Sequence, residues 1–317
     1  MEIATSGERI DPRVDYHYDS IGKNLVTIVL PALNEEQAIG PVISELKDEG
    51  YDNILVIDGY STDNTPNVLR SLGVRTIQQH GKGKTGAIRT AIDHVVTPYF
   101  IVMDADYTYS ARDIERFLVH AHNYSEILGA RKASKNSFAM THMVGNRIIT
   151  SVFNFLIGTR LSDVLTGMYM LRTEDARNLH FHTGGFNVEV EITSQLAQEG
   201  GVTEVPIRYR ERIGKQKLST WRDGLLITSS IFRLARDYNP AFLFSVLAGL
   251  LGIPGIGILG WVFFERYAMG VMHIGWAIAG AVLLLFAAIS VSAGTLSLLM
   301  KRMETRLSRR IRERENL

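Results

Sequence analysis

Two long apolar segments near the C-terminus constrain the fold of this chain more than any other feature. Residues 241–264 carry no charged side chain, and residues 274–300 carry none either. Each segment exceeds the roughly 20 residues that an α-helix needs to cross a hydrocarbon layer about 30 Å thick. A pair of helices buried in a soluble protein is the alternative, but neither segment has the polar face of such a helix. We therefore expect two transmembrane helices.

The flanking charges predict an orientation for these helices. Residues 301–317 contain seven Lys or Arg against three Glu, whereas the connection at residues 265–273 has one Arg and one Glu. Because positive charge is retained on the cytoplasmic side, this basic tail should be cytoplasmic. Two spans place both termini on that side, and the first residues show no secretory signal pattern. We expect a protein of the cell membrane or an equivalent endomembrane. The absence of cysteine fits a reducing compartment but does not decide the matter.

The first 240 residues alternate between short β-rich runs and helical patterns. The expected strands are residues 25–30, 53–57, 75–78 and 99–103, and the expected helices between them are residues 36–49, 65–71 and 85–95. This order predicts an α/β fold with a doubly wound, mostly parallel sheet. Ligands of such sheets bind beyond the carboxyl ends of the strands.

Polar segments follow three of the expected strands. Asp104 and Asp106 come directly after the apolar run 99–103, residues 31–35 follow the first strand, and Asp58 follows the second. Carboxylates two positions apart at a strand end can share Mg²⁺ or Mn²⁺ with a diphosphate, because both ions prefer oxygen ligands. A turn or helix cap is the alternative for an isolated Asp-x-Asp. The convergence of three segments predicts a sugar-nucleotide site.

The order of these motifs resembles that of family-two glycosyltransferases with the GT-A fold. The motifs are Pro31-Ala32-Leu33-Asn34-Glu35-Glu36, Asp58-Gly59-Tyr60-Ser61-Thr62-Asp63-Asn64-Thr65, Gly83-Lys84 and Asp104-Ala105-Asp106. The similarity covers roughly residues 24–235, and it is strongest to the polyprenyl- and dolichyl-phosphate sugar synthases of that family, such as dolichol-phosphate mannose synthases. Gly59 departs from the pattern, since many relatives carry a second Asp there.

The resemblance implies roles on the donor side. It places Pro31, Ala32, Asn34 and Glu35 around the nucleoside, with the Asp58 carboxylate accepting a hydrogen bond from the base. A turn or helix cap within residues 61–63 is the alternative for Asp58.

The resemblance also implies a metal site. It gives Asp104 and Asp106 to Mg²⁺ or Mn²⁺, which would neutralise the departing diphosphate, and Lys84 to the same diphosphate. Thr108 stands where relatives carry a Gln ligand, so we expect it to be a weaker third ligand. Of the two carboxylates, Asp106 is the expected direct ligand.

The acceptor side is expected on an amphipathic interfacial helix within residues 137–158. Ile148 and Phe155 belong to its apolar stripe, whereas Arg147, Ser151 and Asn154 form its polar stripe. Together with Arg131, the Arg147 and Ser151 side chains resemble the lipid-phosphate site of dolichol-phosphate mannose synthases. A core helix with a solvated stripe is the alternative.

Two further segments also match family patterns. The run from Tyr209 to Leu218 resembles a family loop in which Arg212 and Lys217 would stabilise the leaving diphosphate, although Gln216 replaces the usual Ser. Attraction of this basic loop to anionic headgroups is the alternative. Asp163 is a candidate for sugar binding or for a helix cap. Near residue 190, Glu191 matches another family segment better than Glu189 does.

The expected organisation is an N-terminal arm (1–22), a catalytic domain (23–219), an amphipathic interfacial helix (220–239), two spans and a basic tail (301–317). The catalytic residues would be Asp104, Asp106, Arg212 and Lys217.

The resemblance implies inverting transfer of a hexosyl group from a UDP- or GDP-linked sugar to a polyprenyl (dolichyl) phosphate, for glycan assembly or protein glycosylation. The alternatives are a transferase acting on a sugar hydroxyl, in polysaccharide or lipid-linked oligosaccharide synthesis, and a non-catalytic sugar-nucleotide-binding anchor. Membrane lipids are expected partners, nucleic acid is not, and a homo-oligomer is left open.

Overall fold

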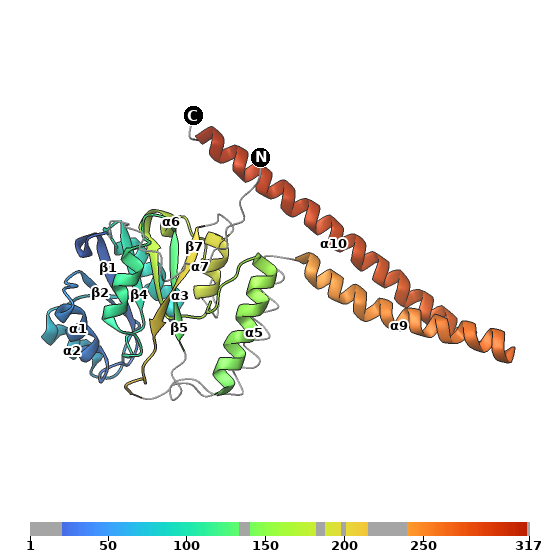
Figure 1. Ribbon diagram of the computed structural model, residues 1–317, viewed down its shortest axis with the longest axis horizontal. Helices are drawn as coiled ribbons and strands as arrows, with labels where there is room; N and C mark the ends of the chain where they lie inside the picture. The colour runs from blue at the N-terminus through green and yellow to red at the C-terminus, as the bar shows by residue number, and fades with distance from the viewer. Residues whose placement is uncertain (1–20, 133–139, 182–187, 198–200, 215–239, 316–317) are drawn as a thin grey trace, which may run out of the picture. The chain divides into compact units, whose positions relative to one another are not determined.

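The computed structural model describes residues 21–132, 140–181, 188–197, 201–214 and 240–315. The chain divides into two compact units, Met1–Ser230 and Ile231–Leu317. The first contains the α/β sheet and the second contains two long helices (Figure 1). The expected arm, Lys217 and the helix expected at residues 220–239 fall outside the described residues, apart from the last two residues of the arm.

Within the described residues of the first unit, seven strands form one sheet in the order β3-β2-β1-β4-β6-β5-β7. They are β1 (Val26–Ala32), β2 (Ile54–Asp58), β3 (Arg75–Gln78), β4 (Tyr99–Met103), β5 (Glu126–Lys132), β6 (Met168–Arg172) and β7 (Val202–Arg208). Strand β6 is antiparallel to both β4 and β5, and the other pairs are parallel. The expected α/β fold with a mostly parallel sheet is confirmed.

Helices cover both faces of this sheet (Figure 1). They are α1 (Ile39–Asp48), α2 (Thr65–Leu72), α3 (Gly83–His94), α4 (Glu115–Leu118), α5 (Met140–Ile157), α6 (Thr173–Arg177) and α7 (Val188–Ala197), with short 3₁₀ turns η1 (Lys23–Leu25) and η2 (Ala111–Ile114). Helix α1 begins three residues later than expected, because a turn at residues 35–38 precedes it.

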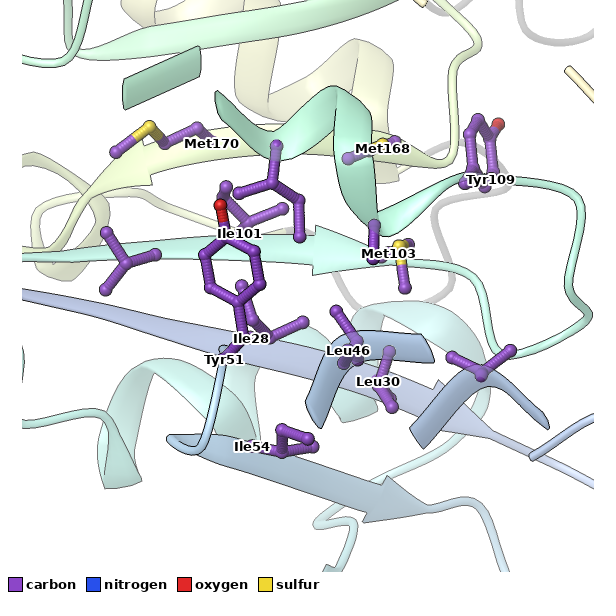
Figure 2. Packing of buried hydrophobic residues seen from close by; sticks show 14 of the residues in the cluster. Ile28, Leu30, Leu46, Tyr51, Ile54, Ile101, Met103, Tyr109, Met168 and Met170 are labelled. Atoms are coloured by element: carbon purple, nitrogen blue, oxygen red, sulfur yellow. The ribbon is translucent and has the colours of Figure 1, made fainter. Parts of the chain in front are cut away.

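The main core fills the face of the sheet that α1 covers. Alternate residues of β1 and β4, such as Ile28 and Ile101, point to this face, where they meet Leu46 of α1 (Figure 2). Met168 and Met170 of β6 extend the same cluster. Full burial of each large aliphatic side chain contributes about 1.5–3 kcal/mol, so this layer holds the strand ends in place.

A buried carboxyl group lies on the opposite face of the sheet, beneath α7. Glu126 of β5 has no exposed surface, and the Thr193 hydroxyl of α7 donates a hydrogen bond to its Oε1 at 3.1 Å. Burial raises the pKa of Glu126 to about 8, against a smaller lowering by the Thr193 hydrogen bond. Glu126 is therefore mainly protonated at neutral pH.

This group predicts a pH-dependent stability that Glu126→Gln should remove. The folded state keeps the proton up to about pH 8, whereas the unfolded chain loses it near pH 4.5, so stability falls as the pH rises through that window. Between pH 5 and pH 8 the free energy of unfolding should fall by about 3 kcal/mol less in the variant than in the wild type. This difference corresponds to several degrees in the unfolding temperature. Thermal unfolding of the detergent-solubilised protein at both pH values measures this. Parallel losses in the two proteins would contradict it.

The second unit consists of α9 (Pro240–Met269) and α10 (Ile274–Glu315), which lie side by side (Figure 1). Residues 240–269 and 274–300 are long and apolar enough to cross a membrane, which agrees with the two predicted spans. Most of their surface is exposed, including Ile253 at 75%. The backbones approach closely where Gly255 faces Gly280, because a Cβ on Gly255 would lie 3.2 Å from the Gly280 carbonyl oxygen.

Candidate active site

The carboxyl ends of β1, β2 and β4 bring the predicted donor segments to one edge of the sheet. Pro31 and Ala32 are the last residues of β1, and Ala32 is in register with Asp58, the last residue of β2. Asp104 directly follows β4, the other neighbour of β1. The expectation that these segments share one edge is therefore confirmed.

The segment that follows β1 is fixed by the loop that precedes α2. Asn34 has a left-handed φ of +52°, which Asn tolerates better than most residues. Its N–H donates to Ser61 Oγ at 2.9 Å, and its Oδ1 accepts the Thr62 N–H at 2.7 Å. The Glu35 N–H donates to the Thr65 hydroxyl at 2.9 Å. The two motifs predicted to hold the nucleoside therefore form a single braced unit.

Asp58 has the turn contact that sequence reasoning gave as its alternative role. The carboxylate is buried, and both of its oxygens lie 3.3 Å from the Ser61 N–H. Gly59 packs tightly here, since a Cβ would lie 3.2 Å from the Ala32 carbonyl oxygen. The recognition of a base by Asp58 stays a prediction.

Two cationic side chains pair with the Asp104 and Asp106 carboxylates. Lys84 Nζ lies 2.7 Å from Asp104 Oδ1 and 2.6 Å from Glu189 Oε1. Arg212 lies 3.1 Å from Asp106 Oδ2 through one terminal nitrogen and contacts Glu35 through the other. The predicted diphosphate ligands Lys84 and Arg212 therefore lie beside the predicted metal ligands.

The electrostatics of Asp106 follow from its burial. Desolvation and the neighbouring Asp104 charge raise the pKa of Asp106, while the Thr108 hydrogen bonds and Arg212 partly oppose that rise. The Thr108 hydroxyl donates to Asp106 Oδ1 at 2.5 Å, and the Thr108 N–H donates to the same oxygen at 3.2 Å. Thr108 thus orients Asp106, and its role as a metal ligand stays a prediction.

The donor set of Asp104 and Asp106 fits Mg²⁺ or Mn²⁺. Within the described residues no group of three or more His, Cys, Asp or Glu is placed to hold a metal ion. Cations that act with nucleotides need only one or two protein carboxylates, because phosphate oxygens and water complete the shell. Asp104 Oδ2 faces Gly167, where a Cβ would lie 1.9 Å from this oxygen. Because Gly167 has no side chain, the Asp104 carboxylate can lie directly against its backbone.

Arg131 and Asp163, expected to act separately, form a buried ion pair. Arg131 Nε lies 2.6 Å from Asp163 Oδ2, and its NH2 lies 2.8 Å from Oδ1. Asn146 of α5 donates to the same carboxylate at 2.9 Å. Burial acts to raise the pKa of Asp163, but Arg131 outweighs it and holds the pKa below its usual value. The pair links β5 to α5, and Asp163 caps no helix in the described residues.

Helix α5 exposes side chains from both of the stripes that the sequence predicts. Ile149 and Phe153 are buried, whereas Ile148 is 48% exposed and Phe155 is 69% exposed. Arg147 and Ser151 are exposed, and the Ser151 hydroxyl donates to the Arg147 carbonyl at 2.7 Å.

The exposure of Ile148 and Phe155 is what an apolar stripe directed at lipid requires, and the interfacial role of α5 stays a prediction. The Asn154 amide bonds the backbone of Leu161 and the Thr159 hydroxyl at the end of α5, instead of joining Arg147 and Ser151. The exposed face combines Arg147 and Ser151 with the apolar side chains of Ile148 and Phe155. That mixture suits a membrane interface.

Sequence reasoning missed two residues of the site. It preferred Glu191 to Glu189, yet Glu189 is the residue that pairs with Lys84. Gly167, the residue before β6, accepts the Asp104 N–H through its carbonyl oxygen, and its own N–H donates to the buried Tyr109 hydroxyl at 2.7 Å. The sequence did not reveal the rotation of α7 about its axis, which decides whether Glu189 or Glu191 faces Lys84.

The seven-stranded α/β sheet and the carboxylate pair at the end of β4 define a GT-A-like glycosyltransferase. A family model described as "Glycosyl transferase family 2" matches residues 27–179. The protein named "Glycosyltransferase AglJ" from Haloferax volcanii is 33% identical over 297 residues, which are 92% of this chain and 98% of that protein. The chain belongs to glycosyl transferase family 2.

Two further proteins extend the comparison. The "Dolichyl-phosphate hexose transferase" of Haloferax volcanii is 29% identical over 228 residues, which are 70% of this chain and 97% of that protein. The crystal structure of glucosyl-3-phosphoglycerate synthase from Mycobacterium tuberculosis with Mn²⁺, UDP-glucose and phosphoglyceric acid has a TM-score of 0.54 at 20% identity, covering 67% of this chain and 78% of that chain. It confirms the GT-A fold.

Proposed function

We propose that the enzyme transfers a hexosyl group from a UDP- or GDP-linked sugar to a polyprenyl (dolichyl) phosphate, with inversion at the anomeric carbon. The product is a lipid-phosphate-sugar that serves as a donor in glycan assembly or protein glycosylation. The observation that carries the proposal is the pairing of the carboxylates around Asp104 with cationic side chains.

Five carboxylates of the site lie within ion-pair distance of Lys or Arg. Asp104 and Glu189 pair with Lys84, Glu35 and Asp106 with Arg212, and Asp163 with Arg131. A sugar hydroxyl acceptor needs a general base, whereas each of these carboxylates is already engaged by a cationic side chain. A phosphate monoester, whose second pKa is about 6, is already largely ionised at pH 7 and attacks without a base. This arrangement favours a phosphate acceptor over a hydroxyl.

The donor half of the reaction then requires alignment and charge stabilisation. Residues 31–35 and Asp58 hold the nucleoside, while Lys84 and Arg212 lie where negative charge grows on the leaving diphosphate. When bound to Asp104 and Asp106, Mg²⁺ or Mn²⁺ supplies Lewis-acid neutralisation of that diphosphate. In-line attack by the phosphate oxygen inverts the anomeric centre.

The lipid half of the proposal rests on other features. Helices α9 and α10 are long and apolar enough to cross a membrane, and α5 exposes Arg147 and Ser151 beside Phe155. A relative that covers 70% of this chain is named as a dolichyl-phosphate hexose transferase. We expect the catalytic unit and both termini on the cytoplasmic side, where sugar nucleotides are available.

The experiment that tests the function uses membranes containing the full-length protein. Each of a panel of UDP- and GDP-hexoses is supplied with and without polyprenyl phosphate, and lipid products are identified by mass spectrometry. We expect one sugar nucleotide to give a lipid-phosphate-hexose, with nucleoside diphosphate release that depends on lipid phosphate. Release that responds only to a sugar hydroxyl, or a product with the donor's anomeric configuration, would contradict the proposal.

Arg147→Ala should weaken binding of the acceptor more than binding of the donor. Loss of charge-assisted hydrogen bonds to a phosphate costs about 1.5–3 kcal/mol, so KM for polyprenyl phosphate should rise about tenfold or more, while KM for the donor changes less than about twofold. Steady-state kinetics with each substrate varied in turn measures both constants. Arg160→Ala, which removes an exposed Arg just beyond α5, is the matched control. Equal changes in the two KM values would refute the acceptor role.

A further inference from the structure

Lys84 is shared between two carboxylates that come from different parts of the fold. Its Nζ lies 2.7 Å from Asp104 Oδ1, beyond β4, and 2.6 Å from Glu189 Oε1, in the first turn of α7. Burial acts to lower the pKa of Lys84, but the Asp104 and Glu189 charges outweigh it and raise the pKa well above its ordinary value. The two contacts divide the charge of Lys84 between a predicted metal ligand and a residue outside the metal site.

Glu189 of α7 is the second carboxylate that pairs with Lys84. Its side chain is 11% exposed, so water screens its pairing with Lys84 only weakly. A second acidic side chain beneath α7, Glu126, is fully buried and has a pKa of about 8, so it is mainly protonated at neutral pH. The nearby Tyr169 hydroxyl is buried and has no hydrogen-bond partner in the described residues. Neither group replaces Glu189 as a counter-ion.

We propose that Glu189 is a positioning residue. It takes up part of the charge of Lys84, so that Lys84 can bind the donor's diphosphate without preventing the divalent cation from binding to Asp104. By neutralising part of the Lys84 charge, Glu189 leaves Asp104 negative enough to bind a divalent cation. By holding Nζ from α7 while Asp104 holds it from the end of β4, Glu189 fixes Lys84 at the strand-end edge, where the diphosphate binds. The inference rests on the proposed function, because it assumes that the donor's diphosphate and its cation meet at Asp104.

The proposal predicts opposite effects of one substitution on two ligands. Glu189→Gln keeps the shape of the side chain and removes one negative charge, so Lys84 pairs with Asp104 alone and the local charge becomes more positive. A divalent cation at Asp104 is then repelled more strongly, whereas a multiply charged anion is attracted more strongly. A residue that only supports the fold would weaken both ligands together.

The test measures equilibrium binding by the full-length protein in detergent, without any sugar transfer. Binding of Mn²⁺ alone is followed by electron paramagnetic resonance, and binding of inorganic pyrophosphate without metal is followed by calorimetry. In Glu189→Gln, we expect Mn²⁺ affinity to fall about tenfold and pyrophosphate affinity to rise about threefold. Lys84→Met should shift both affinities in the opposite directions.

Glu174→Gln is the matched control, because Glu174 is an exposed residue at the start of α6 and the same charge is removed there. It should leave both affinities within about twofold of the wild type. Weaker binding of both ligands in Glu189→Gln, or unchanged Mn²⁺ binding, would overturn the proposal.

Failure of the proposed function gives a different result. A wild-type protein that binds Mn²⁺ and pyrophosphate but does not use lipid phosphate would contradict the acceptor assignment and leave the Glu189 proposal intact. If the wild-type protein makes the lipid product but Glu189→Gln shifts the Mn²⁺ and pyrophosphate affinities in the directions opposite to those expected, only the role of Glu189 is contradicted.

Discussion

Asp106→Asn should lower sugar transfer by about a thousandfold or more while leaving the fold intact. The amide is isosteric with the carboxylate but removes the charge that Arg212 pairs with at 3.1 Å and that a divalent cation requires. The turnover number at saturating Mn²⁺, donor and lipid phosphate is the measurement. The loss should appear mainly in kcat, because charge on the leaving diphosphate develops in the transition state.

A matched control is available on α3. Asp93 is exposed, so Asp93→Asn makes the same chemical change on the surface and should retain full activity. An unchanged circular dichroism spectrum in Asp106→Asn would separate a chemical defect from unfolding. Activity above about a tenth of wild type would show that Asp106 is not the principal metal ligand.

Gly167→Ala should have the second largest effect, although it adds only one methyl group. The new Cβ would lie 1.9 Å from Asp104 Oδ2, which no side chain tolerates, so the Asp104 carboxylate must move. A displacement of about 1 Å at a catalytic group costs about a hundredfold in rate. We expect that loss of transfer together with weaker Mn²⁺ binding, measured in the same preparation.

Gly40→Ala provides the comparison for this glycine. Gly40 lies in α1, where the nearest atom to a new Cβ is a Val68 methyl at 3.9 Å, and Ala is a better helix former than Gly. It should leave activity unchanged and stability equal or higher. Gly167→Ala with normal Mn²⁺ binding and normal activity would disprove the contact between Gly167 and Asp104.

The donor half of the site was predictable because it depends on local patterns. Runs such as residues 99–103 read as strands, and parallel strands carry their carboxyl ends to one edge. The proximity of Asp58, Asp104 and the segment after β1 could therefore be predicted without any knowledge of long-range packing. The structure was needed for the bracing of Asn34 and Glu35 by the loop before α2, and for the contact between Gly167 and Asp104.

The acceptor half was less predictable because it depends on tertiary contacts. The pair of Arg131 and Asp163 joins residues 32 positions apart, and no local pattern indicates it. On the donor side, the choice between Glu189 and Glu191 likewise depends on long-range packing. Residues two positions apart in a helix point in very different directions, and only the rotation of α7 about its axis decides which of them meets Lys84. The burial of Ile149 and Phe153 against the protein could not be predicted either, because apolar side chains lie on both faces of α5.

The antiparallel direction of β6 ties the connection that precedes this strand to the Asp104 carboxylate. Because β6 runs against β4, the residue that precedes the strand, Gly167, reaches the active edge, and Asp104 bonds its carbonyl at 3.2 Å. A change of length between α5 and β6 would therefore shift Gly167 against Asp104. Insertions or deletions in this connection are expected to disturb the predicted cation site as well as the acceptor side.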